Sequence, residues 1–177
     1  MRPIVDNDTM PAAIKELCLK GDKVSQELIE EIGFVPANWG RMDAASRILI
    51  VSVGMLKKRI SQNAFPEETA LILGTHLGCT WVDRQFWEGL SKGLDEASPH
   101  LFAFTLPNIP VSEVAIHYGI KGPVYAVIDE KAPMEKAMQE ARACLSGMPF
   151  ISLVITGHFD IEPESKFVDF GLMVITR

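Results

Sequence analysis

The chain has 177 residues, of which 47% are hydrophobic and 23% are charged, a balance typical of one ordinary globular domain spanning residues 1–177. Its formal net charge of −6 argues against non-specific binding to nucleic acid. No apolar run approaches the roughly 20 residues of a membrane-spanning helix, and the amino-terminal segment is too polar for a signal peptide. We therefore expect a cytoplasmic protein without a membrane span.

Three cysteines occur, Cys18, Cys79 and Cys144, and no two of them have the Cys-x-x-Cys spacing of a zinc site. Their odd number also argues against a disulfide framework. We expect all three to be small core residues in a reducing compartment. The four histidines form no metal-binding pattern either, so the sequence predicts no metal and no cofactor.

Residues 9–33 predict two short helices. Thr9 is the expected cap of the first helix, and Gly21 is its expected end. Ser25 is the expected cap of the second helix, which ends at Gly33.

Residues 43–60 form the longest periodic stretch, with Asp43 as the expected cap. Their apolar residues are too continuous for a surface helix, so this helix should be buried on several sides. The prolines in residues 98–110 indicate a loop. The remaining segments predict strands over 68–75, 122–130, 150–157 and 167–177, and helices over 82–92, 111–119 and 133–147.

The order of these elements indicates an α/β fold. Strands that alternate with helices and read as continuous apolar runs are typical of a mostly parallel sheet that is covered on both faces. The last two strands have no helix between them, so we expect them to be antiparallel neighbours. The sequence therefore predicts a mixed, mostly parallel sheet.

Several segments, taken in order, resemble the amino-terminal half of β-ketoacyl synthases, which have a thiolase-like fold. They are RMDAASR at 41–47, LILGTHLG at 71–78, SPHLFAFTLPN at 98–108 and VAIHYGIKGP at 114–123. The resemblance covers roughly residues 12–177. It implies one thiolase-like half domain with a five-stranded sheet. The first strand should be short or missing, because only Arg2–Val5 could supply it.

The resemblance also locates the family's nucleophile. In that family a Gly-Pro pair opens a strand, and a cysteine follows the strand at the start of the next helix, where the helix dipole stabilises a thiolate. Counted from Gly122-Pro123, this position falls on Lys131. The family's catalytic histidines, its lysine and the glycine-rich part of its oxyanion hole lie in the second half. The resemblance thus implies no catalytic residue here and argues against an active condensing enzyme.

Three side chains are candidates for facing a ligand: Lys131, Phe104 and His158. A desolvated lysine can form a Schiff base, but Asp129 beside Lys131 would favour its charged form. We therefore favour a solvent-facing or ion-paired lysine at an inactive site. His158 and Asp160 follow an expected strand, where functional residues gather in parallel sheets.

The helix expected over residues 133–147 has one apolar and one wet face, which suits a stand-alone half domain. The expected apolar face consists of Met134, Ala137, Met138, Ala141 and Leu145.

An edge strand is the expected site of pairing. In the resembling fold the strand that corresponds to residues 124–128 lies at the sheet edge and pairs antiparallel with its copy. An open apolar edge invites aggregation, so we expect a homodimer or a heterodimer with a ketosynthase. The strand consists of Val124, Tyr125, Ala126, Val127 and Ile128.

Three functions remain open at this point. The first is a non-catalytic synthase-like subunit of fatty-acid or polyketide-type biosynthesis, paired with itself or with an active condensing enzyme. The second is a homodimer that binds an acyl chain or an acyl carrier protein. The third is an acyltransferase-type enzyme that uses Lys131 in chemistry foreign to the family.

Overall fold

The computed structural model describes residues 3–21, 24–60 and 65–177. Its centre is a five-stranded sheet with the strand order β1-β5-β4-β2-β3. The strands are β1 (Val5–Asp6), β2 (Thr69–Thr75), β3 (Val124–Ile128), β4 (Leu153–Glu162) and β5 (Phe167–Thr176). β2 pairs in parallel with β3 and β4, whereas β5 is antiparallel to β4 and β1, so β5 alone opposes the common direction. The expected mixed, mostly parallel sheet and its short first strand are confirmed.

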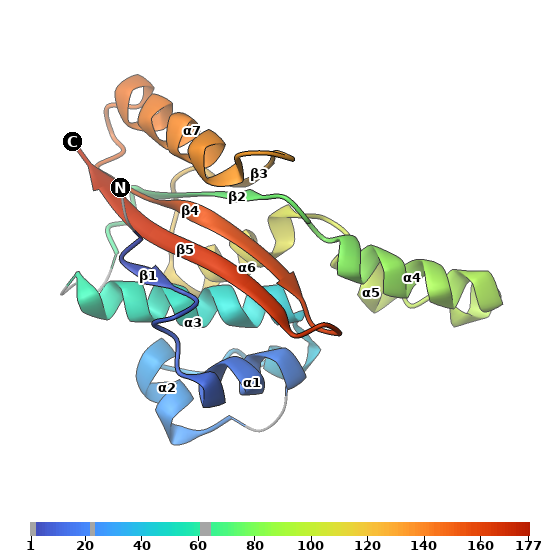
Figure 1. Cartoon of the computed structure of the whole chain (residues 1–177). Helices are drawn as coiled ribbons and strands as arrows, with labels where there is room; N and C mark the ends of the chain where they lie inside the picture. Colours follow the sequence, from blue (N-terminus) through green and yellow to red (C-terminus); the bar gives the residue numbers. More distant parts are fainter. Residues whose placement is uncertain (1–2, 22–23, 61–64) are drawn as a thin grey trace.

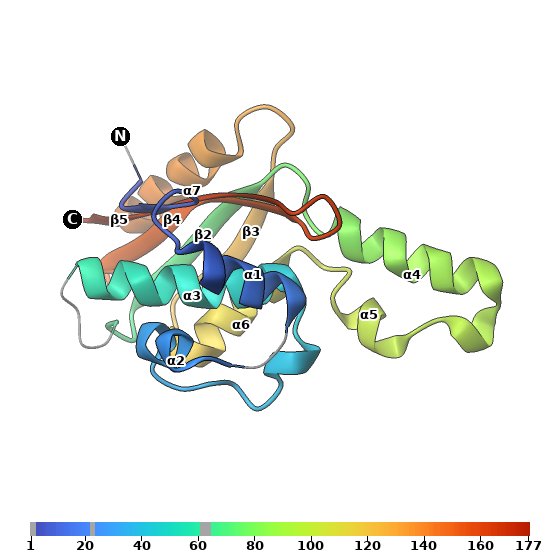
Figure 2. The ribbon, with the colours of Figure 1, turned by 60° about the horizontal axis from the view of Figure 1, so that its bottom comes forward.

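Helices cover both faces of the sheet (Figure 1). One face carries α1 (Ala12–Lys20), α2 (Gln26–Ile32), α3 (Ala44–Arg59) and α6 (Asn108–Tyr118), and the other carries α7 (Pro133–Gly147). An arm built from α4 (Thr80–Lys92), α5 (Pro99–Ala103) and the short 3-10 helix η2 (Leu94–Glu96) projects beyond the sheet (Figure 2). A second 3-10 helix, η1 (Trp39–Arg41), precedes α3. None of the described helices is long and apolar enough to cross a membrane.

The helix ends follow from local sequence. The Ser25 side chain accepts a hydrogen bond at the start of α2, and Asp43 does the same at the start of α3. α1 ends at Gly21 and α2 at Gly33, whose φ angles of 70° and 85° favour glycine. These four expected boundaries are confirmed.

Thr9 is a correction. It does not cap α1, because α1 begins at Ala12, directly after Pro11. The Thr9 hydroxyl instead accepts a 2.9 Å hydrogen bond from the backbone N–H of Asp6, and it closes the turn that follows β1.

The expected loop over residues 98–110 is also wrong in part. Ser98 caps α5, and α6 begins at Asn108 rather than at residue 111. Pro99 and Pro110 fall in the first turns of these helices, where no backbone N–H is needed, so they do not interrupt them.

The core lies on both sides of the sheet. α3 is buried from Ala44 to Leu56, as its continuous apolar sequence predicts. On the opposite face, Ala137, Ala141 and Leu145 of α7 pack against the sheet. The outward residues of α7 are solvent-exposed, which confirms its single wet face; they include Glu135, Gln139 and Arg142.

Candidate functional site

Lys131, which the resemblance aligns with the family's nucleophile, lies in the turn between β3 and α7. This turn sits directly against the sheet: a Cβ added to Gly74 of β2 would come within 1.9 Å of the Pro133 carbonyl oxygen. Only glycine allows that approach. Gly74 therefore places the amino-terminal end of α7 over the carboxyl end of β2.

Asp129 holds the turn that precedes α7. One carboxylate oxygen of Asp129, Oδ1, accepts hydrogen bonds from the backbone N–H of Lys131 (2.9 Å) and of Ala132 (2.8 Å). These bonds hold the pKa of the Asp129 carboxyl below its usual range. Backbone N–H groups at a helix start are the groups that can stabilise an anion. The two groups that Asp129 bonds lie directly before Pro133, the first residue of α7, and the Lys131 side chain is exposed to solvent.

Asp160 is part of β4 and not of a loop after it, because β4 continues to Glu162 in its pairing with β5. Its carboxylate is buried and Oδ1 accepts three hydrogen bonds from the turn that ends β2. The donors are the Thr75 hydroxyl (2.8 Å), the His76 N–H (2.9 Å) and the Leu77 N–H (2.7 Å). The expectation that His158 and Asp160 follow a strand is therefore wrong. Asp160 fixes the turn after β2.

His158 lies inside β4 and is the register partner of Gly74. Its Nε2 is 3.4 Å from a carboxylate oxygen of Asp169, and its Nδ1 is buried without a hydrogen-bond partner in the described part of the chain. Sequence reasoning missed this pair because Asp169 lies on β5, across the hairpin. The register places His158 beside the strand on which the start of α7 rests.

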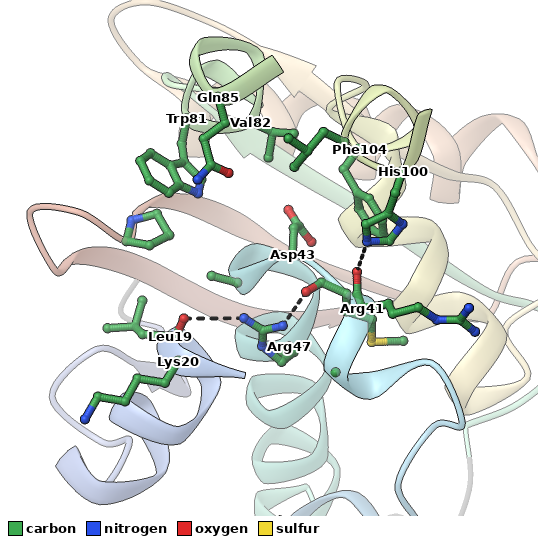
Figure 3. A pocket seen from close by; sticks show the side chains of 15 residues that line it. Leu19, Lys20, Arg41, Asp43, Arg47, Trp81, Val82, Gln85, His100 and Phe104 are labelled. Carbon is green, nitrogen blue, oxygen red and sulfur yellow. Dashed lines mark hydrogen bonds between the residues drawn. The ribbon is translucent and has the colours of Figure 1, made fainter. Parts of the chain in front are cut away.

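Phe104 is buried and lies apart from both Lys131 and His158. It lines a cavity of about 290 Å³ between the arm and the amino-terminal helices (Figure 3), and neither Lys131 nor His158 lines that cavity. The three candidates for facing a ligand do not form one site.

The cysteine thiols are buried or hydrogen-bonded within the fold. Cys18 and Cys144 are buried, as expected. The Cys79 thiol donates a 2.8 Å hydrogen bond to the Thr105 carbonyl oxygen, and burial raises its pKa to about 12, so it is a poor nucleophile. Within the described ranges, no group of three or more His, Cys, Asp or Glu residues could hold a metal ion.

β3 forms one edge of the sheet, as expected. Its outward-facing backbone is partly occupied, because the Asn108 Oδ1 accepts a 2.8 Å hydrogen bond from the Ala126 N–H. Asn108, the first residue of α6, thus holds the backbone of β3. Ile128, at the end of β3, is 59% exposed, and so is Leu106 on the adjoining segment.

Replacing Gly74 with alanine should lower the free energy of unfolding by about 3 kcal/mol, because the new methyl group meets backbone that cannot move cheaply. Urea denaturation measures this loss. Gly40→Ala is the matched control, since a Cβ there meets nothing within 4 Å. Equal stability of the two variants would show that α7 does not rest on β2.

His117 illustrates the structural use of histidine in this fold. Its Nε2 lies 2.9 Å from the Ile32 carbonyl oxygen, so this nitrogen carries the proton of the neutral ring. Its Nδ1 is buried without a hydrogen-bond partner among the described residues, and the ring stacks on Phe34 at 4.3 Å. Burial accordingly lowers the pKa of His117.

Stability should therefore fall on acidification, starting near pH 6.5. The unfolded chain takes up a proton on His117 at about that pH, and the folded chain resists until lower pH, so the loss amounts to at most about 1.4 kcal/mol per pH unit. Urea denaturation between pH 7 and pH 5 measures the slope. His117→Gln, which can still donate to the Ile32 carbonyl, should flatten it. An unchanged slope in this variant would exclude His117 as its source.

Comparisons with known proteins identify the fold. No family model matches the sequence, and no curated protein matches it. Among solved structures, the ishigamide ketosynthase/chain length factor is similar with a TM-score of 0.64 and 19% identity, over 85% of this chain and 47% of that chain. A ketosynthase in complex with its chain length factor from Xenorhabdus doucetiae has a TM-score of 0.62 and 14% identity, over 89% of this chain and 74% of that chain.

A third structure is a type II polyketide synthase acyl-carrier protein in complex with its ketosynthase, with a TM-score of 0.62 and 15% identity, over 93% of this chain and 57% of that chain. The chain spans about half the length of the ishigamide structure. The expected resemblance is confirmed at the level of fold: the chain has the architecture of a ketosynthase-like half domain.

Proposed function

We propose that the chain is a non-catalytic β-ketoacyl-synthase-like subunit, a single cytoplasmic domain associated with fatty-acid or polyketide-type biosynthesis, which pairs with itself or with an active condensing enzyme. The proposal rests on the arrangement of residues 129–132, directly before α7. An exposed lysine stands at the position that the resemblance aligns with the family's nucleophile, and Asp129 bonds the backbone N–H groups of Lys131 and Ala132, directly before the helix.

The kind of partner is suggested by the similar structures. Two of them are described as a ketosynthase with its chain length factor, and as a ketosynthase with an acyl-carrier protein. By analogy, a second ketosynthase-like subunit is the first partner to test, and an acyl carrier protein is the second.

The edge strand β3 is the proposed pairing site. Because Asn108 already bonds the Ala126 N–H, we place the contact in side chains as well as backbone, with exposed Ile128 and Leu106 at its centre. Ile128 adjoins Pro107: a Cβ added to Gly78 would meet both side chains within 4 Å.

Sedimentation velocity at micromolar concentration tests the pairing. The chain should form a dimer alone or with a purified ketosynthase, and Ile128→Asp should abolish that dimer, since a charge at an apolar contact is costly to bury. Phe150→Asp is the matched control, because Phe150 is 64% exposed and lies before β4. Equal loss of pairing in both variants would remove β3 as the site.

A chemical test separates this proposal from catalysis at Lys131. A Schiff-base lysine needs a desolvated site, whereas Lys131 is exposed. Incubation with an acyl thioester, and borohydride treatment in the presence of a carbonyl compound, should leave no adduct on Lys131 by mass spectrometry. An adduct that forms faster there than on exposed Lys92 would contradict a non-catalytic subunit.

A further inference from the structure

One face of α6 borders the open edge of the sheet. β3 forms that edge, and α6 packs beside it. Asn108 reaches the edge from the start of α6, because its Oδ1 accepts the 2.8 Å hydrogen bond from the Ala126 N–H. Residues four apart share one face of a helix, so Ser112 and Ile116 lie in line with Asn108. Ile116 is 77% exposed, a high value for an isoleucine.

Apolar side chains thus lie at both ends of this edge. The chain leaves α6 and turns directly into β3, so the end of α6, with Ile116, lies near the start of β3. Ile128 is the last residue of β3 and Leu106 precedes α6, and both are 59% exposed at the opposite end. The middle of the edge offers less backbone, because Asn108 already bonds the Ala126 N–H. A contact here therefore needs the apolar side chains at the two ends.

The stripe of α6 along the edge carries no charge. Glu113 is the one acidic residue in the sequence of α6, and its Oε1 accepts a 3.4 Å hydrogen bond from the Asn38 side chain, in the segment before α3. Burial lowers the pKa of His117, so this ring stays neutral near pH 7. An uncharged contact does not repel an identical molecule, although each copy has a net charge of −6.

Two identical surfaces meet about a two-fold axis, and such an axis makes paired edge strands antiparallel. The start of each β3 then faces the end of the other, with both α6 helices on the same side of the joined sheet. We propose that the partner is a second copy of this chain, and that Ile116 of each copy packs against the partner's Leu106. This assignment rests on the proposed pairing through β3. Ser112, which lies between the two positions, is small and lets the α6 helices approach.

Single charged substitutions test the contact by sedimentation velocity of the full chain. Ile116→Glu and Leu106→Lys should each weaken the homodimer by about tenfold in Kd, since every homodimer then buries two unpaired charges. Both side chains are exposed, so urea denaturation of the variants should match that of the parent. Leu94→Lys, at an 83% exposed position in η2, is the matched control and should dimerise like the parent. An Ile116→Glu variant that dimerises as tightly as the parent would overturn the proposal.

A mixture of two variants tests the exchange between copies. Ile116→Glu mixed with Leu106→Lys should form a heterodimer, which native mass spectrometry separates from the homodimers. One of its contacts joins opposite charges and the other keeps both original side chains, so its Kd should be about tenfold lower than that of either variant alone. Ile116→Glu mixed with Leu106→Glu is the control and should not pair, because like charges meet. Equal pairing in the two mixtures would contradict the proposal.

The failure of this contact is distinguishable from the failure of the proposed function. A chain that is monomeric alone but pairs with a ketosynthase would overturn the second copy as partner and leave the proposed function standing. A homodimer that Ile128→Asp abolishes and Ile116→Glu leaves intact would overturn the contact of α6 and leave the pairing through β3 standing. A monomer both alone and with a ketosynthase would overturn both.

Discussion

Replacement of Arg47 with methionine should lower the free energy of unfolding by about 4 kcal/mol. The guanidinium group is buried within the fold and donates to backbone carbonyl oxygens of two separate segments: Cys18 (2.5 Å) and Leu19 (3.4 Å) at the end of α1, and Trp39 (3.5 Å) and Met42 around η1. The carbonyls at a helix end have no partner within the helix. Without Arg47 the carbonyls of Cys18, Leu19 and Met42 lose this donor, so α1 and η1 lose their attachment to α3.

Chemical denaturation of Arg47→Met measures this loss. Arg47→Lys should lose less, because one ammonium group keeps the charge but reaches fewer acceptors. Arg59→Met is the matched control: Arg59 is exposed, with a single 2.6 Å bond to the Ile4 carbonyl, and its loss should stay below about 1 kcal/mol. If Arg47→Met were as stable as Arg59→Met, Arg47 would not hold the two segments together.

Asp160→Ala should cost a similar amount, about 4 kcal/mol. Three donors, Thr75 Oγ1 and the N–H groups of His76 and Leu77, share its buried Oδ1. Hydrogen bonds to a charged acceptor are the stronger kind, and removal of the acceptor leaves the donors unsatisfied. The turn after β2 leads into α4, so we also expect faster amide exchange in the arm.

Asp160→Asn should recover part of the stability, since its side-chain oxygen can still accept. Asp169→Ala is the control: Asp169 is the register partner of Asp160 on β5 but is 55% exposed, so it should lose less than about 1 kcal/mol. Equal melting temperatures for Asp160→Ala and Asp169→Ala would refute the role given to Asp160.

The strands and the helix ends could be predicted because each depends on residues that are close together in the sequence. Helix ends are marked by residues whose side chain or backbone suits that position: Ser25 and Asp43 at the starts, Gly21 and Gly33 at the ends. The continuous apolar sequence of α3 predicts its burial. α5 and the first turn of α6 were missed because proline in a first turn looks like a helix breaker.

The site could be predicted only in part. The Gly-Pro pair placed Lys131 in a turn before a helix, where the structure has it, but the hydrogen bonds of Asp129 to that turn depend on backbone geometry that spacing does not encode. Asp160 and its donor Thr75 are 85 residues apart in sequence, so no local pattern joins them. His158 and Asp169 meet only through the register of a hairpin.

We propose that the chain pairs through β3. Sedimentation velocity of the purified chain at micromolar concentration, alone and mixed with a ketosynthase from the same organism, tests it most directly. We expect a dimer in at least one of the two samples and its loss in Ile128→Asp. A monomer in both samples, or a dimer that Ile128→Asp leaves intact, would contradict it.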